Sequence, residues 1–194
     1  MTVNRLYSNK HKVINIIEQA FKNNPSVTTV INPKLPNALT ALARYAYETA
    51  YLRKGIYLTP DGEATALCYR YNAKKEGFKD YFNQVKLIHH CIGWQRLFTV
   101  LKRDAYIKKQ RPRDGSFLYF WFFGATDKGK QSGSAWALKR EIFEQSNSEG
   151  LPIYLETSVE KNKRVYERMG FETYHIWPQA TGGNLFFMRR MPKD

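Results

Sequence analysis

Tyr166 and Glu156 are the two side chains of this sequence best placed for proton transfer. Tyr166 lies in a short helix expected at 159–169, one turn after Asn162 and on the same face. A phenol with an ordinary pKa of about 10 is protonated at neutral pH and can act as an acid. Glu156 ends an expected strand, where a carboxylate can act as a base, directly or through water. The structural alternatives are a core position for Tyr166 and, for Glu156, ordering of the helix start at 157–160 or an ion pair with Lys or Arg.

A polar segment between a strand and a helix is the second chemical feature. It follows an apolar run at 117–124, precedes an expected helix at 134–146, and reads Lys128-Gly129-Lys130-Gln131-Ser132-Gly133-Ser134. The free N–H groups and the dipole at a helix N-terminus favour anions, and the two lysines add positive charge. We therefore expect a loop that binds a phosphate-bearing cofactor.

The elements that must position these residues follow from apolar periodicity and turn residues. Helical spacing predicts helices at 11–22 and 37–54, the second closed by Gly55, and a long helical region at 80–109 that Gly93 divides. Val27–Ile31 is β-branched and is expected to be a strand or an extended link. Further strands are expected at 56–58, 64–71, 117–124, 153–155, 171–177 and 185–190, with hairpin turns around Asp61-Gly62 and Gly182-Gly183. This order predicts a single α/β domain over 1–194, with a mixed, mostly antiparallel sheet, helices on both faces and a helical insertion at about 80–110 before the central strand.

Composition limits the class of protein. The chain has 194 residues, a formal net charge of +14 and two cysteines, Cys68 and Cys91, in apolar settings. These cysteines indicate buried free thiols in a reducing cytoplasm, and no His/Cys spacing indicates a metal site. The basic residues gather at 102–103, 108–113, 128–130, 161–164 and 189–190, which we interpret as a generally basic surface. We expect a cytoplasmic monomer or homodimer with no specific nucleic-acid or membrane partner, because no nucleic-acid motif, signal pattern or spanning segment is visible.

The carboxyl-terminal half resembles a known family. Leu155-Glu156-Thr157-Ser158, Asn162, Tyr166-Glu167-Arg168 and Gly170-Phe171 together look like the GNAT superfamily of acetyl-CoA-dependent N-acetyltransferases, in the branch that contains puromycin N-acetyltransferase. The resemblance implies a GNAT fold whose central strand parts from its neighbour at a bulge. It also implies that acetyl-CoA enters the gap along the backbone of Phe123, Gly124 and Ala125, where a bulge N–H near Phe123 or Gly124 polarises the thioester carbonyl.

The resemblance also assigns roles to the polar residues. It places the pyrophosphate of the cofactor on Lys128 to Ser134, gives Asn162 a cofactor contact, and makes Tyr166 the acid for the thiolate that leaves. Two departures stand out, because Gln131 replaces a glycine of the family pattern and the loop is about two residues short.

We therefore expect an enzyme that transfers acetyl directly to a primary amine, most simply that of a small molecule. The acceptor is expected between the amino-terminal helices and the insertion at 81–101. The alternatives are a basic binding module with a degenerate cofactor loop, and an enzyme that acts on a protein N-terminus or lysine.

Overall fold

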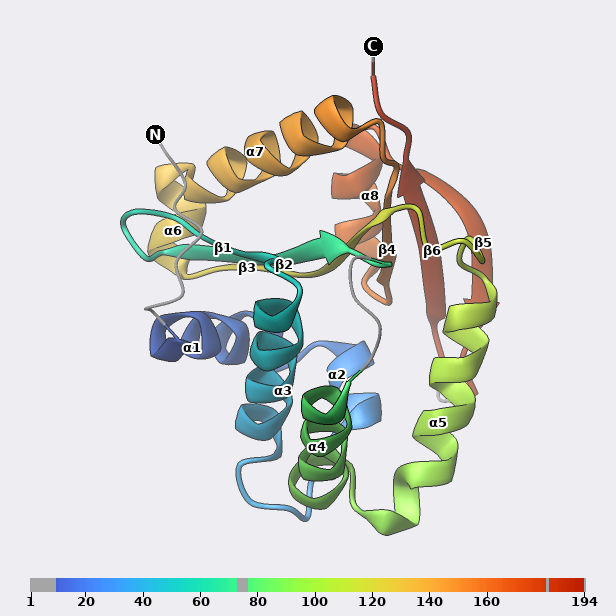
Figure 1. Ribbon diagram of the computed structural model, residues 1–194. Helices are drawn as coiled ribbons and strands as arrows, with labels where there is room; N and C mark the ends of the chain where they lie inside the picture. Colours follow the sequence, from blue (N-terminus) through green and yellow to red (C-terminus); the bar gives the residue numbers. More distant parts are fainter. Residues whose placement is uncertain (1–9, 73–76, 181, 194) are drawn as a thin grey trace.

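A single six-stranded sheet organises the chain (Figure 1). The computed structural model describes residues 10–72, 77–180 and 182–193. In this part of the chain the strand order is β1-β2-β3-β4-β6-β5, and only the β3–β4 pair is parallel. This confirms the mixed, mostly antiparallel sheet. The strands are β1 (Ile56–Leu58), β2 (Ala64–Arg70), β3 (Leu118–Ala125), β4 (Ile153–Thr157), β5 (Glu172–Pro178) and β6 (Asn184–Arg190).

Helices cover both faces of the sheet, as the apolar periodicity predicts (Figure 1). One face carries α1 (Lys10–Phe21), α2 (Pro25–Val30), α3 (Ala38–Leu52) and the insertion, which consists of α4 (Phe78–Leu87), a π-helical turn η1 (Ile88–Ile92) and α5 (Trp94–Lys109). The other face carries α7 (Ser134–Glu149) and α8 (Glu160–Arg168), and the short α6 (Asp127–Ser132) lies next to α7. Each face has its own buried apolar cluster, so the sheet separates two cores.

Two local predictions were wrong. Val27 lies in α2 rather than in a strand, because Pro25 occupies the first turn and the side chain of Asn24 caps the helix by accepting from the N–H of Ser26. At the end of α3 the left-handed residue is Lys54, with φ of 53°, and not Gly55. Gly55 is required for close packing, since a Cβ there would lie 2.4 Å from Cβ of Tyr69.

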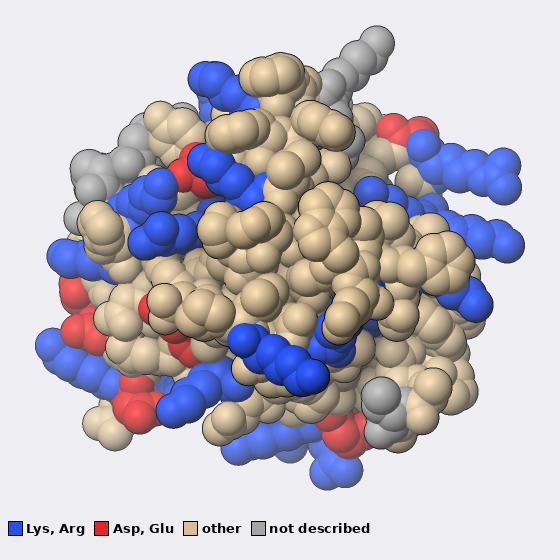
Figure 2. Space-filling view, turned by 90° about the horizontal axis from the view of Figure 1, so that it is seen from below, with Lys and Arg blue, Asp and Glu red and all other residues tan. Residues whose placement is uncertain are grey.

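The insertion divides where the sequence predicts. Gly93 has a φ of 74°, which an L-residue rarely adopts, and the chain turns there from η1 into α5. Figure 2 views the molecule from the lower end of Figure 1, where the insertion lies, and shows Lys and Arg side chains spread around the rim of this face. Within the described residues, no helix combines the length and the apolar character needed to cross a membrane.

The sheet opens between its two central strands. β3 and β4 are paired only at Leu118–Ile153 and Tyr119–Tyr154, so within the described ranges β3 has no strand partner on that side from Phe120 onward. On its other side β3 has a bulge, because Leu67 pairs with Phe122 and Cys68 with Phe120. Trp121 is the extra residue, and it packs toward the same core as Phe122. The expected parting of the strands is confirmed, but the bulge lies at Trp121 and not near Phe123 or Gly124.

Candidate active site

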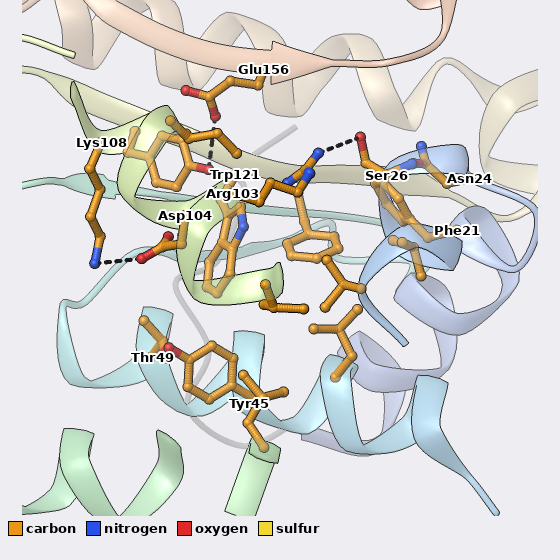
Figure 3. Close-up of a pocket in the computed structure, with 18 of the residues that line it drawn as sticks. Phe21, Asn24, Ser26, Tyr45, Thr49, Arg103, Asp104, Lys108, Trp121 and Glu156 are labelled. Atoms are coloured by element: carbon orange, nitrogen blue, oxygen red, sulfur yellow. Dashed lines mark hydrogen bonds and ion pairs between the residues drawn. The ribbon is translucent and has the colours of Figure 1, made fainter. Parts of the chain in front are cut away.

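A cavity of about 600 Å³ lies where β3 and β4 part (Figure 3). It extends from this gap to the helices on the α1–α3 face, and the insertion contributes residues from Asp80 to Lys108 to its wall. The amino-terminal helices and the insertion, which were expected to bound the acceptor, both line this cavity. Much of the lining is aromatic: Phe21, Tyr45, Tyr69, Tyr71, Tyr119, Phe120, Trp121, Phe122, Phe123 and Tyr166.

Helix α8 brings Asn162 and Tyr166 to the cavity, as their spacing predicts. The ring of Tyr166 meets those of Phe120 and Phe171 edge-on, at centroid distances of 6.3 and 5.5 Å. Burial raises the pKa of Tyr166 to about 12, so its phenol is protonated at neutral pH. Its hydroxyl has no hydrogen-bond partner within the described residues, which leaves it able to donate to a bound group.

Glu156 is held in a buried ion pair. The Arg111 guanidinium donates to its two oxygens over 2.9 Å (Nε to Oε1) and 2.8 Å (Nη2 to Oε2), and the Tyr119 hydroxyl donates over 3.0 Å. Both charged side chains are 7% exposed. The guanidinium also lies 3.9 Å from the centre of the Tyr119 ring. Burial alone would lower the pKa of Arg111, but the Glu156 carboxylate outweighs it and raises that pKa well above its ordinary value.

This geometry selects between the alternatives that the sequence left open for Glu156, because the carboxylate pairs with an arginine. The Arg111 guanidinium and the Tyr119 hydroxyl already donate to both oxygens of this buried carboxylate. The Glu156 carboxylate is therefore better suited to holding the β4 end, Arg111 and Tyr119 together than to accepting a proton.

Arg103 extends from α5 into the same cavity (Figure 3). Its Nη2 lies 3.5 Å from Oγ of Ser26, a long contact. Its Nε is buried without a hydrogen-bond partner in the described part of the chain. Burial lowers the pKa of this guanidinium, and the nearby Tyr119, Glu156 and Asp104 offset this only in part. Ser26 is itself fixed across the cavity by a 2.8 Å hydrogen bond to Ser158, which joins α2 to the end of β4.

The expected phosphate loop is helical. Residues Asp127–Ser132 form α6, capped by the Thr126 hydroxyl, which accepts from the N–H of Gly129. Gly129 is buried against the β1–β2 turn, and a Cβ there would lie 2.4 Å from the carbonyl oxygen of Glu63. The prediction of a loop at Lys128–Gly133 was wrong for Lys128 to Ser132, because this close contact and the cap favour a helical turn, whereas α7 begins at Ser134 as predicted. Gln131 and Ser132 are exposed at its end.

Carboxylates lie beside this segment. Lys128 is 3.3 Å from Glu63 and Lys130 is 2.8 Å from Asp127. Gly133, with φ of 79°, turns the chain into α7, whose first residue Ser134 donates to Asp61 over 2.6 Å. Burial alone would raise the pKa of Asp61, but hydrogen bonds from Ser134 and Thr59 outweigh it and lower that pKa.

The three strand residues expected along the cofactor differ in their surroundings. Phe123 lines the cavity. Gly124 and Ala125 are buried and pair with Thr65 and Ala64 on β2, and a Cβ on Gly124 would lie 2.8 Å from Cβ of Ala20 in α1. The unpaired edge of β3 fits an extended chain such as pantetheine. The phosphate end fits less well, because α6 and its carboxylates replace an open loop.

Sequence reasoning missed Arg103, Arg111 and Tyr119. The two arginines lie in basic runs that suggested surface, yet both line the cavity. A signal was present for Arg103, since it follows Val100 by three residues and precedes Ile107 by four, on the apolar side of α5. In the residues that the structure describes, no group of three His, Cys, Asp or Glu side chains could hold a metal ion.

Comparisons with known proteins agree with this fold. No protein-family model matches the chain. An uncharacterised N-acetyltransferase of Schizosaccharomyces pombe is 30% identical over 102 residues, which are 53% of this chain and 36% of the yeast protein. The match thus spans about a third of the length of that relative.

Solved acetyltransferases have the same architecture over nearly the whole chain. A Corynebacterium glutamicum structure described as histone acetyltransferase HPA2 and related acetyltransferase superposes with a TM-score of 0.64, at 17% identity, over 97% of this chain and 94% of that chain. Arylalkylamine N-acetyltransferase 2 of Aedes aegypti gives 0.66, at 13% identity, over 99% of both chains. The chain therefore has the mixed α/β fold of the GNAT acetyltransferases.

Proposed function

We propose that this protein is an N-acetyltransferase that transfers acetyl from acetyl-CoA directly to the primary amine of a small molecule. The observation that carries the proposal is the cavity at the parted strands, because Tyr166 and Asn162 on α8 line it together with many aromatic side chains. Its volume of about 600 Å³ is in the range of small-molecule sites.

Several residues of the gap are suited to the donor. In this proposal the free edge of β3 beyond Tyr119 pairs with the pantetheine arm, Phe123 and Asn162 contact it, and Lys128 to Ser134 meet the phosphates. Acetyl-CoA supplies the activated acetyl group as a thioester. A backbone N–H at the Trp121 bulge is the candidate for polarising its carbonyl, since a bulge frees backbone groups from the β2–β3 ladder.

Tyr166 acts in this proposal as a hydrogen-bond donor to the thiolate. With a pKa of about 12 it is a weaker acid than an alkyl thiol, whose pKa is about 8.5. Its proton therefore stays mainly on the phenol, and the hydroxyl stabilises the charge by hydrogen bonding. The Glu156–Arg111 pair fixes the end of β4, and the acceptor amine loses its proton to water.

The acceptor class rests on two supports. The aromatic lining of the cavity suits a compact apolar amine, and the resemblance of the Leu155–Phe171 stretch to the puromycin N-acetyltransferase branch points the same way. The aromatic acceptor in the name of the Aedes neighbour agrees with this lining.

The test is release of free CoA thiol from acetyl-CoA with a panel of small primary amines, with product mass as confirmation. We expect turnover by the wild type, and a fall in kcat of about 10- to 100-fold in Tyr166→Phe with the KM for acetyl-CoA nearly unchanged. The adjacent exposed Val165→Ala is the matched control. Unchanged kcat in Tyr166→Phe would remove Tyr166 from the chemistry.

One observation favours a second candidate, a binding module with a degenerate cofactor site: α6 replaces an open phosphate loop and pairs its lysines with carboxylates. Failure of the wild type to bind acetyl-CoA at concentrations on the order of hundreds of micromolar, together with no turnover on any amine or on lysine-bearing peptides, would support that candidate.

A further inference from the structure

We infer that the acceptor carries an acid group, a carboxylate or a phosphate, in addition to its amine, and that Arg103 binds that group. This inference deepens the proposed function and rests on it for the acceptor role of the cavity.

Three of the basic side chains that line the cavity pair with carboxylates in the described residues, and Arg103 does not. Among the residues that the structure describes, the lining holds four basic and three acidic side chains. Three pairs account for six of them: Arg53 with Asp80 at 2.9 Å, Lys108 with Asp104 at 2.9 Å, and Arg111 with Glu156 at 2.8 Å. Arg103 is the fourth cation, and within the described ranges no carboxylate pairs with it.

The surroundings of Arg103 are costly for a charge that has no partner. Its Nε is buried and makes no hydrogen bond to the described residues, and its Nη2 makes only a long contact of 3.5 Å with the Ser26 hydroxyl. Burial also lowers the pKa of the guanidinium. Charges taken out of water are ordinarily paired, so this half-buried guanidinium, with its Nε buried, is suited to a ligand that completes the pair.

A guanidinium defines the chemistry of that ligand. Its planar fork matches the two oxygens of a carboxylate or phosphate, and such bidentate pairs are among the strongest polar contacts in proteins. The neighbouring Ser26 and Asn24 add polar groups on the same side, while Phe21 and Trp121 supply an aromatic wall (Figure 3). The acceptor class is therefore an aromatic or apolar primary amine that also bears an acid group.

The experiment compares amines that differ only in the acid. Phenethylamine is the reference that has no acid group. In 4-(2-aminoethyl)benzoate and 4-(2-aminoethyl)phenyl phosphate the acid is on the ring, and in phenylalanine a carboxylate is next to the amine. Each is tested by thiol release with the wild type, Arg103→Met and the matched control Lys102→Met, whose side chain is exposed on the same helix.

We expect at least one acid-bearing amine to exceed phenethylamine in kcat/KM by about tenfold or more in the wild type. Arg103→Met should lose about 10- to 150-fold on that amine, the range for a hydrogen bond to a charged group, and lose little on phenethylamine. Lys102→Met should change neither. Comparison of kcat/KM between the carboxylate-bearing and the phosphate-bearing amines identifies which acid group is preferred. Equal rates for neutral and acidic amines, or a loss that falls on the KM for acetyl-CoA, would overturn the inference.

A binding experiment with acids that carry no amine tests the inference without catalysis. Because no carboxylate among the described residues pairs with Arg103, Arg103→Met should melt at or above the wild-type temperature. Phenyl phosphate or 3-phenylpropionate should raise the melting temperature of the wild type and not that of Arg103→Met. If no amine is acetylated but these shifts appear, the proposed activity fails and the anion site stands. If neither acid stabilises the wild type more than the variant, the inference fails.

Discussion

Replacing Glu156 by Gln separates a structural role for this residue from a catalytic one. The change keeps the shape of the side chain and removes the charge that the Arg111 guanidinium contacts through two hydrogen bonds. Arg111 is then left charged at 7% exposure. Removing one partner of a buried ion pair costs about 3–5 kcal/mol. In a domain of this size each kcal/mol lowers the melting temperature by about 2–4 °C, so Glu156→Gln should melt about 6–20 °C below the wild type.

The two roles predict opposite patterns in activity and stability. We expect kcat, measured well below the melting temperature, to fall less than about tenfold and the pH profile to keep its shape, whereas loss of a general base costs about 10²–10⁴-fold. Calorimetry gives the stability and thiol release gives kcat. The exposed Glu160→Gln on α8 is the control, with almost no effect on either measurement.

A double variant sharpens this result. Arg111→Met with Glu156→Leu removes both charges, and apolar replacement of a buried pair is often neutral or stabilising, so much of the lost melting temperature should return. A normal melting temperature in Glu156→Gln, together with a hundredfold loss of kcat and of the acidic limb of the pH profile, would refute the structural role.

Three further predictions concern other parts of the fold. Cys68 and Cys91 are buried, and burial raises the pKa of the Cys91 thiol to about 12. Neither thiol should therefore react with a thiol reagent in the native protein, and both should react once it is denatured. Rapid labelling of the native protein would contradict this prediction. Burial raises the pKa of Tyr166 above its ordinary value to about 12, so its contribution to stability is complete below about pH 10 and is lost as the pH rises toward 12. Urea midpoints between about pH 9 and 11.5 should therefore fall more steeply in the wild type than in Tyr166→Phe, and parallel curves would exclude the effect. Gly55→Ala places a Cβ 2.4 Å from Cβ of Tyr69 and should lower the free energy of unfolding by denaturant by about 1–3 kcal/mol or more. An unchanged denaturant midpoint would show that β2 can shift to relieve this contact without loss of stability.

The sequence predicted the parts of the fold that depend on local pattern. Apolar periodicity found α1, α3 and α7, turn residues found the two hairpins, and Gly93 marked the break in the insertion. The spacing of Asn162 and Tyr166 placed both at the cavity, because a four-residue interval fixes one helix face.

Contacts between distant residues were beyond that reasoning. The partner of Glu156 is 45 residues away in the chain, and the hydrogen bond between Ser26 and Ser158 spans 132. The helical state of α6 depends on a glycine that packs against the Glu63 backbone, which no local pattern reveals. Arg103 looked like surface because charge in a sequence indicates exposure until the packing of its helix is known.

Titration calorimetry with acetyl-CoA tests the central claim, that the donor enters the gap between β3 and β4. The wild type should bind with a dissociation constant of about 100 μM or tighter, a value typical of enzyme substrates. Asn162→Trp places a large ring at the cavity and should abolish the heat of binding, whereas Lys161→Trp, exposed one residue earlier on α8, should bind as the wild type does. No heat from the wild type, or equal binding by Asn162→Trp, would contradict the account.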